Sequence, residues 1–553
     1  MTALPDVPLA GSGPPAGGVP SPDDAPAEAA SVVPAVASMV VPDPGRSAVP
    51  TPDPAGPGSL RVRDGARVVV VVWVVFSRLA AASIVGVLTV ARRHAWGWLR
   101  RISGQLSGGH RRRAAGHLPS GPPRFVPVGG GGAPGQGGSM GDERSSWLPA
   151  LASVAADGLI DAFIALGPTF VKVGQLMASA PGVFPAPLAT AAERCLDAVP
   201  PFPAEQARQT IEEDLGRPAT ELFRSFDEVP LASASIGQVH SCVLADGRQA
   251  VVKVQRPGIV DRMLSDLRIA GWLARQAERF QAARRLNPTG LVADMHEVTV
   301  AELDFVLEAC HQRAFRDNIG AFGDNAWVTA PEVYPELCGP RVICMERLWG
   351  VPVDEFDVLR ERGLDGEMLM RRGLKVGLEA VCIHGPFHAD THAGNIWVLD
   401  DGRTAFLDFG ITGELPGPWR AMVRDLFRTF MIDGNWARMV RNYKDLGVLA
   451  ADIGSDEDVG RLLQVATEPV LDAEAVAIDL AELFGTQLDL AREMGASVPR
   501  ELMLVAKQLF YFERYMKELA PGYAIARDLF LVKNIWPEEA AARAAELGVV
   551  FPE

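Results

Sequence analysis

The chain has 553 residues, a formal net charge of −15 and a pI of about 5.2, and 48% of its residues are hydrophobic. This length exceeds what one small core needs, and the hydrophobic content excludes wholesale disorder. The net negative charge argues against a surface built to neutralise nucleic-acid phosphates, so we expect no nucleic-acid partner. The six cysteines form no C-x-x-C pair, which argues against a zinc ribbon or disulfide framework and indicates reduced thiols in the cytosol.

The N-terminal part of the chain divides into a tail, a hydrophobic segment and a linker. Residues 1–60 are rich in Pro, Ala, Gly and Ser without helical or strand periodicity, which predicts a disordered tail. Residues 68–91 form an aliphatic run long enough to span a bilayer, although Arg78 lies near its middle. A spanning helix, a helix lying in the membrane interface and a buried soluble helix all remain open.

Arginines are concentrated around this hydrophobic run. Eleven arginines and one acidic residue, Asp64, lie between Arg61 and Arg113, and the denser cluster follows the run. That asymmetry is typical of a cytoplasmic membrane flank, so we expect the folded part on the cytoplasmic face of the cell membrane, in contact with membrane lipids. The glycine-rich stretch 129–138 lacks the G-K-[ST] of a phosphate-binding loop and is interpreted as linker.

A first predicted hairpin carries a lysine on its second strand. Residues 235–244 and 248–255 are rich in β-forming residues and flank an Ala-Asp-Gly turn, and Lys253 has apolar neighbours on this run. A lysine there is costly unless it is paired or binds a ligand. Downstream, Glu302, Asp304 and Glu308 lie close in sequence, and Asp304 and Glu308 are predicted to share a helical face at i, i+4.

The most informative motif runs from His388 to Gly410. Two apolar runs flank the turn Asp400-Asp-Gly-Arg403, which predicts a second hairpin. If residue 399 faces residue 404, Asn395 faces Asp408, and these two side chains offer oxygen ligands to Mg²⁺. Asp390 precedes Asn395 by five residues, so the chain contains the D-x-x-x-x-N and D-F-G motifs of kinase catalytic and metal-binding loops.

A rival interpretation of the same stretch takes His388, Asp390 and His392 as transition-metal ligands. That interpretation leaves Asn395 and the Asp-Phe-Gly sequence unexplained.

With these residues in place, the chain from about residue 150 onward resembles the UbiB/AarF-like family of atypical kinases. Lys172-Val-Gly174-Gln175 resembles the family's K-x-G-Q motif, and Glu302-Leu-Asp304 resembles its E-x-D motif. Residues 232–237 resemble its alanine-rich loop, which replaces the glycine-rich loop of other kinases. Two departures are Thr391 and Ala393, where the family usually has prolines.

The resemblance implies an α+β, two-lobed protein-kinase-like fold with a helical N-terminal extension, preceded by the tail and the membrane-type helix. It also implies an enzyme that uses Mg²⁺ and ATP, and that also binds ADP, in quinone or isoprenoid-lipid metabolism. Its partners would be an isoprenoid or quinone-precursor lipid and quinone-biosynthesis proteins. A nucleotide-binding regulatory module with little catalysis and a small-molecule phosphotransferase remain alternatives.

The resemblance also assigns roles to individual residues. Asp390 would be the catalytic base or water-orienting acid and Lys253 the phosphate clamp, with Asn395 and Asp408 as metal ligands. The expected nucleotide-binding residues are Ala232, Ser233, Ala234, Ser235, Lys253, Glu308 and Met345. The expected gating residues are Lys172, Gln175, Glu302 and Asp304, with Lys172 pairing with Glu302 or Asp304, and Lys253 pairing with Glu308.

The predicted organisation has six parts. They are a tail (1–60), a hydrophobic membrane-associated helix (66–94), a basic and Gly-rich linker (95–145), a helical extension with the K-x-G-Q motif (146–215), a kinase-like N-lobe (216–348) and a kinase-like C-lobe with C-terminal helices (349–553). Within the last part, the apolar helix 499–519 is predicted to be core.

Overall fold

The computed structural model describes residues 147–178, 185–196, 200–284, 287–472, 499–523 and 528–552, and the single residues 71, 77 and 525. The predicted tail 1–60, the linker up to residue 145 and the hydrophobic segment 66–94, apart from Val71 and Ser77, lie outside these described residues. Val71 is helical and 1% exposed, and it belongs to the apolar cluster of the helices that follow. Every helix within the described ranges is too short or too polar to cross a membrane.

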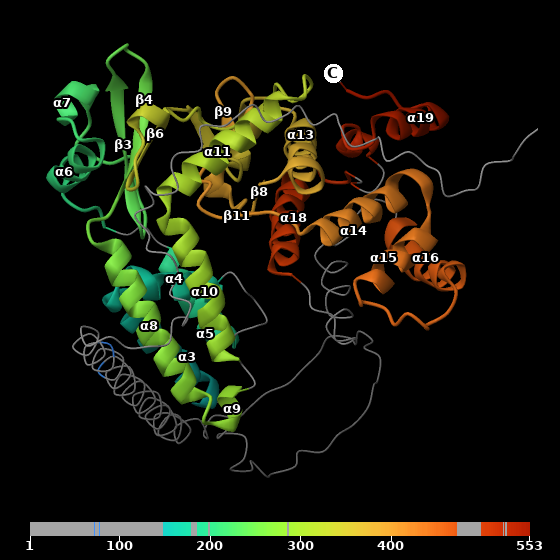
Figure 1. Ribbon diagram of the computed structural model, residues 1–553, viewed down its shortest axis with the longest axis horizontal. Coiled ribbons are helices and arrows are strands. Elements are labelled where there is room, and N and C mark those ends of the chain that lie inside the picture. The colour runs from blue at the N-terminus through green and yellow to red at the C-terminus, as the bar shows by residue number, and fades with distance from the viewer. Residues whose placement is uncertain are drawn as a thin grey trace, which may run out of the picture. The chain divides into compact units, whose positions relative to one another are not determined.

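A group of helices precedes the first sheet (Figure 1). Its members are α3 (Trp147–Leu166), α4 (Pro168–Ala178), α5 (Ala186–Ala192) and η3 (Glu193–Leu196). Helix α4 contacts the other three and α8 (Ile259–Ala277), which in turn packs on α10 (Pro288–Leu303). Gly174 permits the close approach of α4 and η3, because a Cβ there would collide with Cys195 Sγ.

The first sheet is antiparallel, with strand order β1-β3-β4-β6 and β2 paired to β3. Its strands are β1 (Phe223–Phe226), β2 (Ala232–Ser233), β3 (Gly237–Leu244), β4 (Gln249–Gln255) and β6 (Val342–Glu346). One face of this sheet packs on α6 (Ala204–Leu215) and α7 (Ala219–Leu222). The other face packs on α8, α10 and α11 (Phe305–Gly320).

Alternation along β4 decides which side of this sheet Lys253 faces. Val252 and Val254 lie in the apolar cluster with α6, so Lys253 between them points to the opposite face, toward α11. The β3–β4 hairpin predicted from the sequence is present, with Val239 opposite Lys253.

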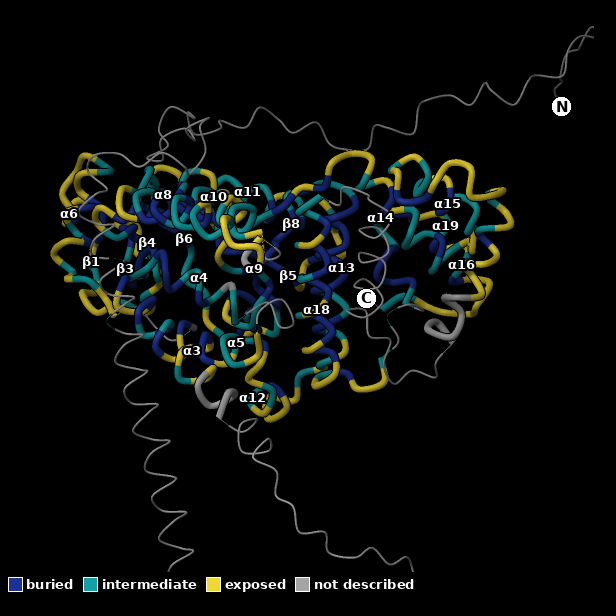
Figure 2. The backbone as a smooth tube through the Cα atoms, turned by 90° about the horizontal axis from the view of Figure 1, so that it is seen from below, coloured by how far each residue is buried: buried dark blue, intermediate teal, exposed yellow. Residues whose placement is uncertain are grey.

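The second sheet has the order β5-β10-β9-β7, and a separate pair joins β8 to β11. These strands are β5 (Val328–Thr329), β7 (Gly350–Pro352), β8 (Phe387–His388), β9 (Ile396–Leu399), β10 (Thr404–Phe406) and β11 (Thr412–Gly413). Helices α13 (Gly366–Glu379) and α18 (Arg500–Leu519) pack against each other, and both contribute to the large core of this region (Figure 2).

The described residues contain further helical segments, several of which contribute apolar side chains to the core that includes the second sheet. They are α9 (Gln281–Arg284), η4 (Pro335–Leu337), α12 (Phe356–Glu361), α13 (Gly366–Glu379), η5 (Ala380–His384), η6 (Ala393–Asn395), α14 (Gly417–Arg428), η7 (Thr429–Asp433), α15 (Trp436–Asp445), α16 (Asp456–Asp472), α18 (Arg500–Leu519), η9 (Leu529–Val532) and α19 (Pro537–Leu547). The predicted core helix 499–519 corresponds to α18, whose buried side includes Leu502, Val505 and Leu509.

Two elements cross the predicted domain boundaries, which otherwise stay predictions. Helix α6, assigned by sequence to the helical extension, packs on the first sheet. Strand β5, assigned to the N-lobe, pairs in parallel with β10 of the second sheet.

The predicted register of the β9–β10 hairpin is wrong by one residue. Ile396 pairs with Phe406, and the Leu407 N–H donates to the Asn395 carbonyl at 2.8 Å, so Asn395 stands opposite Leu407 and not Asp408. The reason lies in the turn, because Leu399 N–H donates to Arg403 O and Gly402 takes φ = 85°. The loop therefore has three residues with a left-handed glycine at its end, one fewer than the sequence reasoning assumed.

Asp304 also departs from its predicted place. It lies between α10 and α11 with non-helical φ and ψ, and its side chain accepts from the Leu307 N–H at 3.1 Å. Asp304 is thus the N-cap of α11 and does not share a helical face with Glu308.

Candidate active site

A buried ion cluster occupies the site between β4, α11 and the loop after β10. Lys253 Nζ lies 2.6 Å from Glu308 Oε1 and 3.2 Å from Asp408 Oδ2. Lys253 and Glu308 are buried, whereas the Asp408 side chain is 49% exposed. The Lys253–Glu308 pair expected from the sequence is therefore present, and Asp408 joins it.

Burial and charge set the protonation of this cluster in opposite directions. Removal from water raises the pKa of Glu308 to about 7, although Lys253 favours its ionised form. Lys253 and the Gly410 N–H hold the pKa of Asp408 at about 2 in spite of the surrounding protein. The two carboxylates raise the pKa of Lys253 in spite of its burial. At neutral pH Lys253 is charged and Asp408 ionised, and Glu308 is at its titration point.

Backbone strain aims Asp408 into the site. Asp408 has φ = 55°, a left-handed value that is uncommon for residues other than glycine, and its Oδ1 accepts from the Gly410 N–H at 3.2 Å. A Cβ on Gly410 would lie 3.1 Å from Asp408 Oδ1 and 3.6 Å from Glu302 Cγ. Glycine at 410 therefore lets this turn fit against the acidic end of α10.

The loop before β9 is fixed through a buried histidine. His388 is 0% exposed, its Nε2 lies 2.8 Å from the Leu407 carbonyl, and its Nδ1 accepts from the Asp390 N–H at 3.2 Å. Burial lowers the pKa of His388, so the ring is neutral, with its proton on Nε2. Both ring nitrogens are engaged, which argues against the rival metal-ligand interpretation. Among the described residues no group of three or more His, Cys, Asp or Glu side chains is arranged to hold a metal ion.

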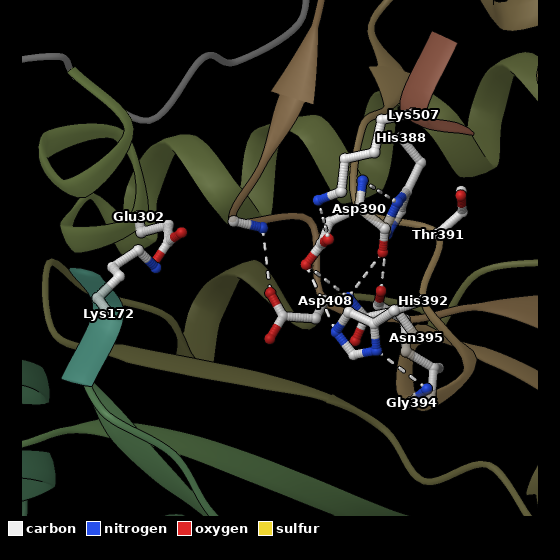
Figure 3. A network of polar contacts seen from close by, with 12 residues as sticks. Lys172, Glu302, His388, Asp390, Thr391, His392, Gly394, Asn395, Asp408 and Lys507 are labelled. Carbon is white, nitrogen blue, oxygen red and sulfur yellow. Dashed lines mark hydrogen bonds and ion pairs between the residues drawn. The ribbon is translucent and has the colours of Figure 1, made fainter. Parts of the chain in front are cut away.

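Asp390 receives cations and donors from several directions (Figure 3). Lys507 Nζ donates to Asp390 Oδ1 at 2.7 Å, and His392 Nε2 lies 3.4 Å from Oδ2. Burial opposes ionisation, yet Lys507 and His392 hold the pKa of Asp390 below its ordinary value. The carboxylate is therefore ionised at neutral pH, as a proton acceptor or water-orienting group requires.

Asn395 has the orientation that an oxygen-coordinated cation needs. Its Nδ2 donates to the Asp390 carbonyl at 3.0 Å, which leaves Oδ1 as the free end of the amide to accept a cation. Amide and carboxylate oxygens are ligands that Mg²⁺ prefers. The residues present thus fit an Mg²⁺ ion held by Asn395 and Asp408, although the two are not the cross-strand pair that the sequence reasoning assumed.

The K-x-G-Q helix closes on the site through one ion pair. Lys172 Nζ pairs with Glu302 Oε2, and the Lys172 and Glu302 side chains are 17% and 8% exposed (Figure 3). Burial raises the pKa of Glu302, against the effect of Lys172. Gln175 instead donates to the Cys195 carbonyl at 3.0 Å and so ties α4 to η3. Of the predicted gating residues, Lys172 and Glu302 meet at the site, whereas Gln175 ties α4 to η3 and Asp304 caps α11.

The alanine-rich loop is held by an arginine at the end of β4. Arg256 donates to the Ala234 carbonyl at 3.0 Å, to Ser233 Oγ at 2.8 Å and to the Pro200 carbonyl at 2.8 Å. Ala232 and Ser233 form β2, so this end of the loop is part of the sheet. Ser235, next in the loop, precedes β3.

Met345, also expected at the nucleotide site, is 8% exposed in β6. Its sulfur lies 3.4 Å from Gln312 Nε2 of α11.

Two site residues escaped the sequence reasoning. The sequence pattern places Lys507 in a core helix and predicts no role for Arg256. The signal for Lys507 is a lysine within the mostly apolar stretch 502–512 of this helix, a position that is costly without a partner. The signal for Arg256 was its place directly after the β-rich run that carries Lys253.

The chain is similar to several known proteins. Residues 194–443 match the family model of the ABC1 atypical kinase-like domain. The uncharacterized protein Rv0647c of Mycobacterium tuberculosis is 37% identical over 370 residues, which cover 66% of this chain and 75% of that protein. A probable protein kinase UbiB of Pseudomonas putida is 34% identical over 383 residues, or 68% of this chain and 70% of that protein.

Two further similarities extend this set. An uncharacterized aarF domain-containing protein kinase of Arabidopsis thaliana, described as chloroplastic, is 34% identical over 391 residues, which cover 66% of this chain and 72% of that protein. A solved structure described as the complex of Rv3197 with erythromycin, from Mycobacterium tuberculosis, covers 69% of this chain and 99% of its own at 24% identity, with a TM-score of 0.40.

Proposed function

This chain belongs to the ABC1 family of atypical kinase-like proteins, which includes the UbiB and AarF domain kinases, and from that membership we propose that it is an Mg²⁺-dependent ATPase or kinase. The observation that carries the proposal is the buried Lys253 between Glu308 and Asp408, next to a loop that presents Asp390 and Asn395. A lysine held by an acid, two oxygen ligands for a cation and an ionised carboxylate are the parts that phosphoryl transfer from ATP requires.

Each residue has a separate role in the proposed reaction. Lys253 holds nucleotide phosphates, and Glu308 keeps its ammonium in place. Asn395 and Asp408 would hold Mg²⁺, which would neutralise phosphate charge when bound. Asp390 orients the attacking water or hydroxyl group and accepts its proton.

The Lys172–Glu302 pair favours a small acceptor over a protein. This pair ties α4 to α10 beside the catalytic residues. We propose that α4 thereby occupies the space that a peptide would need, so that water or a small lipid-like molecule is the acceptor. By its resemblance to the UbiB/AarF family, the proposed setting is quinone or isoprenoid-lipid metabolism.

The decisive experiment measures Mg²⁺-dependent ATP binding and hydrolysis by the full chain. We expect Asp408→Asn to lose the enhancement of ATP affinity by Mg²⁺ while retaining its fold. Asp401→Asn is the matched control, because Asp401 lies on the same hairpin, is half exposed and pairs with Arg403 at 2.7 Å. Unchanged Mg²⁺-ATP affinity in folded Asp408→Asn would refute the metal assignment. Binding without turnover in the wild type would support the regulatory alternative.

We also propose that the hydrophobic segment 66–94 holds the protein on the cytoplasmic face of the cell membrane. The support is the aliphatic run and the arginines that follow it. Deletion of residues 1–94 should then release the protein to the soluble fraction, whereas high salt should not release the intact chain. Resistance to carbonate extraction would indicate a spanning helix. Recovery of the intact chain without detergent would assign the segment to a contact with α3 to α5, where Val71 is buried.

A further inference from the structure

One face of helix α18 is directed at the catalytic loop. Lys507, Tyr511 and Tyr515 follow one another at intervals of four residues and so lie along one side of the helix. Lys507 Nζ donates to Asp390 Oδ1 at 2.7 Å and lies 5.8 Å from the Tyr511 ring centroid. The Tyr515 hydroxyl donates to the Thr391 carbonyl at 3.1 Å. Two consecutive loop residues are thus bound by one helix, and Figure 3 shows the first of these contacts, from Lys507 to Asp390.

The rest of α18 is packed so tightly that Lys507 has a fixed position. Phe512 is 1% exposed, and a Cβ on Gly373 of α13 would lie 3.2 Å from its ring. A Cβ on Gly377 of the same helix would lie 2.8 Å from Nε2 of Gln508, the residue after Lys507. At its start, Arg500 pairs at 2.9 Å with Glu297 of α10, the helix that carries Glu302. Helix α18 therefore holds the Lys507 ammonium group in place, and no loop has to become ordered first.

The charges around the site show why this ammonium is useful. Lys253 is enclosed by Glu308 and Asp408, and Lys172 pairs with Glu302. Lys507 pairs with Asp390, the carboxylate that would orient the attacking water or hydroxyl group. The Lys507 side chain is still 34% exposed. A transferring phosphoryl group carries negative charge on its equatorial oxygens, and positioned cations stabilise that charge.

We propose that Lys507 is a catalytic residue whose ammonium binds the γ-phosphoryl group of ATP beside Asp390. This inference rests on the proposed ATPase or kinase activity and adds a residue from outside the matched domain 194–443. In hydrolysis the water oxygen forms a bond to the γ-phosphorus, and the bond from that phosphorus to the bridging oxygen of ADP breaks. ADP leaves with the electron pair, Asp390 receives the water proton, and Lys507 stays protonated throughout.

The test compares full-length wild type, Lys507→Met, Lys507→Arg and the control Arg514→Met. Arg514 is an exposed cation on the same helix, so its removal changes net charge equally without touching the site. Affinity is measured for Mg²⁺-ADP and for a non-hydrolysable Mg²⁺-ATP analogue, and turnover is measured with ATP. We expect Lys507→Met to lose roughly 100-fold in kcat, the order seen when one charge-stabilising donor is removed. It should bind the ATP analogue about tenfold more weakly and ADP as the wild type does, because only ATP has the γ-phosphate.

The outcomes separate this inference from the proposed function. Partial recovery of kcat by Lys507→Arg would support the inference. The Arg variant also keeps the proposal testable if the Met variant fails to fold. An equal loss of affinity for both nucleotides, or wild-type kcat in a folded Lys507→Met protein, would overturn it and leave the proposed function standing. Failure of the wild type to bind either nucleotide would overturn both.

Discussion

If the chain binds Mg²⁺-ATP as proposed, we expect the acid Glu308 to make that binding depend on pH near neutrality. Its carboxylate is buried against Lys253, and burial raises its pKa to about 7. Asp408, the second partner of Lys253, is also the proposed metal ligand. If Asp408 coordinated Mg²⁺ in the complex with ATP, Lys253 would depend on ionised Glu308 for its position.

The magnitude follows from the titration of that one group. With a pKa of about 7, roughly nine tenths of Glu308 is ionised at pH 8 and roughly one tenth at pH 6. If only the ionised form positions Lys253, affinity for Mg²⁺-ATP should weaken about tenfold between these two pH values. Glu308→Gln cannot ionise, so its affinity should be lower at pH 8 and nearly independent of pH over this range.

Stability should change in the opposite direction. The folded-state pKa of Glu308 is raised from 4.5 to about 7, so the folded protein binds its proton more tightly than the unfolded chain does. Its stabilising contribution is fully present below pH 4.5 and is lost as the pH rises through 7. At about 1.4 kcal/mol per pKa unit, the unfolding free energy of wild type relative to Glu308→Gln should fall by about 3 kcal/mol between pH 4.5 and pH 7.

Two assays check this reasoning on the same pair of proteins. Isothermal titration with a non-hydrolysable Mg²⁺-ATP analogue at pH 6, 7 and 8 gives the affinity, and urea unfolding at pH 5 and 8 gives the stability difference. Each measurement uses Glu308→Gln as its reference, so pH effects of other groups cancel. A wild-type affinity that is flat with pH, or one that changes in parallel with the Gln variant, would refute the assignment of the titration to Glu308.

Two further substitutions test the Lys172–Glu302 pair and the turn at Gly410. Lys172→Met should destabilise the protein by about 3 kcal/mol in thermal unfolding, because it leaves Glu302 buried without its ammonium partner, and Lys172→Met combined with Glu302→Gln should recover part of that loss. The same single variant should raise autophosphorylation, and a wild-type level would refute the gating role. Gly410→Ala should weaken Mg²⁺-ATP affinity severalfold without a change in circular dichroism, because its Cβ would press on Asp408 Oδ1 at 3.1 Å; unaltered affinity would show that this turn tolerates a side chain.

Local patterns in the sequence predicted the strands well, but they left the pairing register open. Both hairpins form around Asp-Gly turns, as their composition indicates. The number of loop residues is decided by whether the turn glycine takes a left-handed conformation, as Gly402 does at φ = 85°. That choice depends on the closing backbone hydrogen bonds and is not visible in residue types alone. One residue of difference moved Asn395 from Asp408 to Leu407 in the ladder.

The same limit applies to the site. Asp390, Asn395 and Asp408 lie within one short stretch, so a motif identifies them together. Lys507 is 117 residues from Asp390, and only the packing of α18 on α13 brings the two together. Sequence periodicity correctly assigned α18 to the core, but it could not distinguish a lysine at the edge of that core from one that contacts a catalytic carboxylate.

Three lysines from separate parts of the chain bind the acids of the site: Lys253 binds two of them, and Lys172 and Lys507 bind one each. Lys172 and Lys507 lie outside the matched domain 194–443, whereas their partners Glu302 and Asp390 lie inside it. The domain alone would therefore hold two carboxylates without their cations, and burial of such groups is unfavourable. Helices α4 and α18 supply the two missing positive charges, Lys172 and Lys507, from outside the domain. We therefore expect any lipid, partner or nucleotide that moves α4 or α18 to change the electrostatics at Glu302 or Asp390.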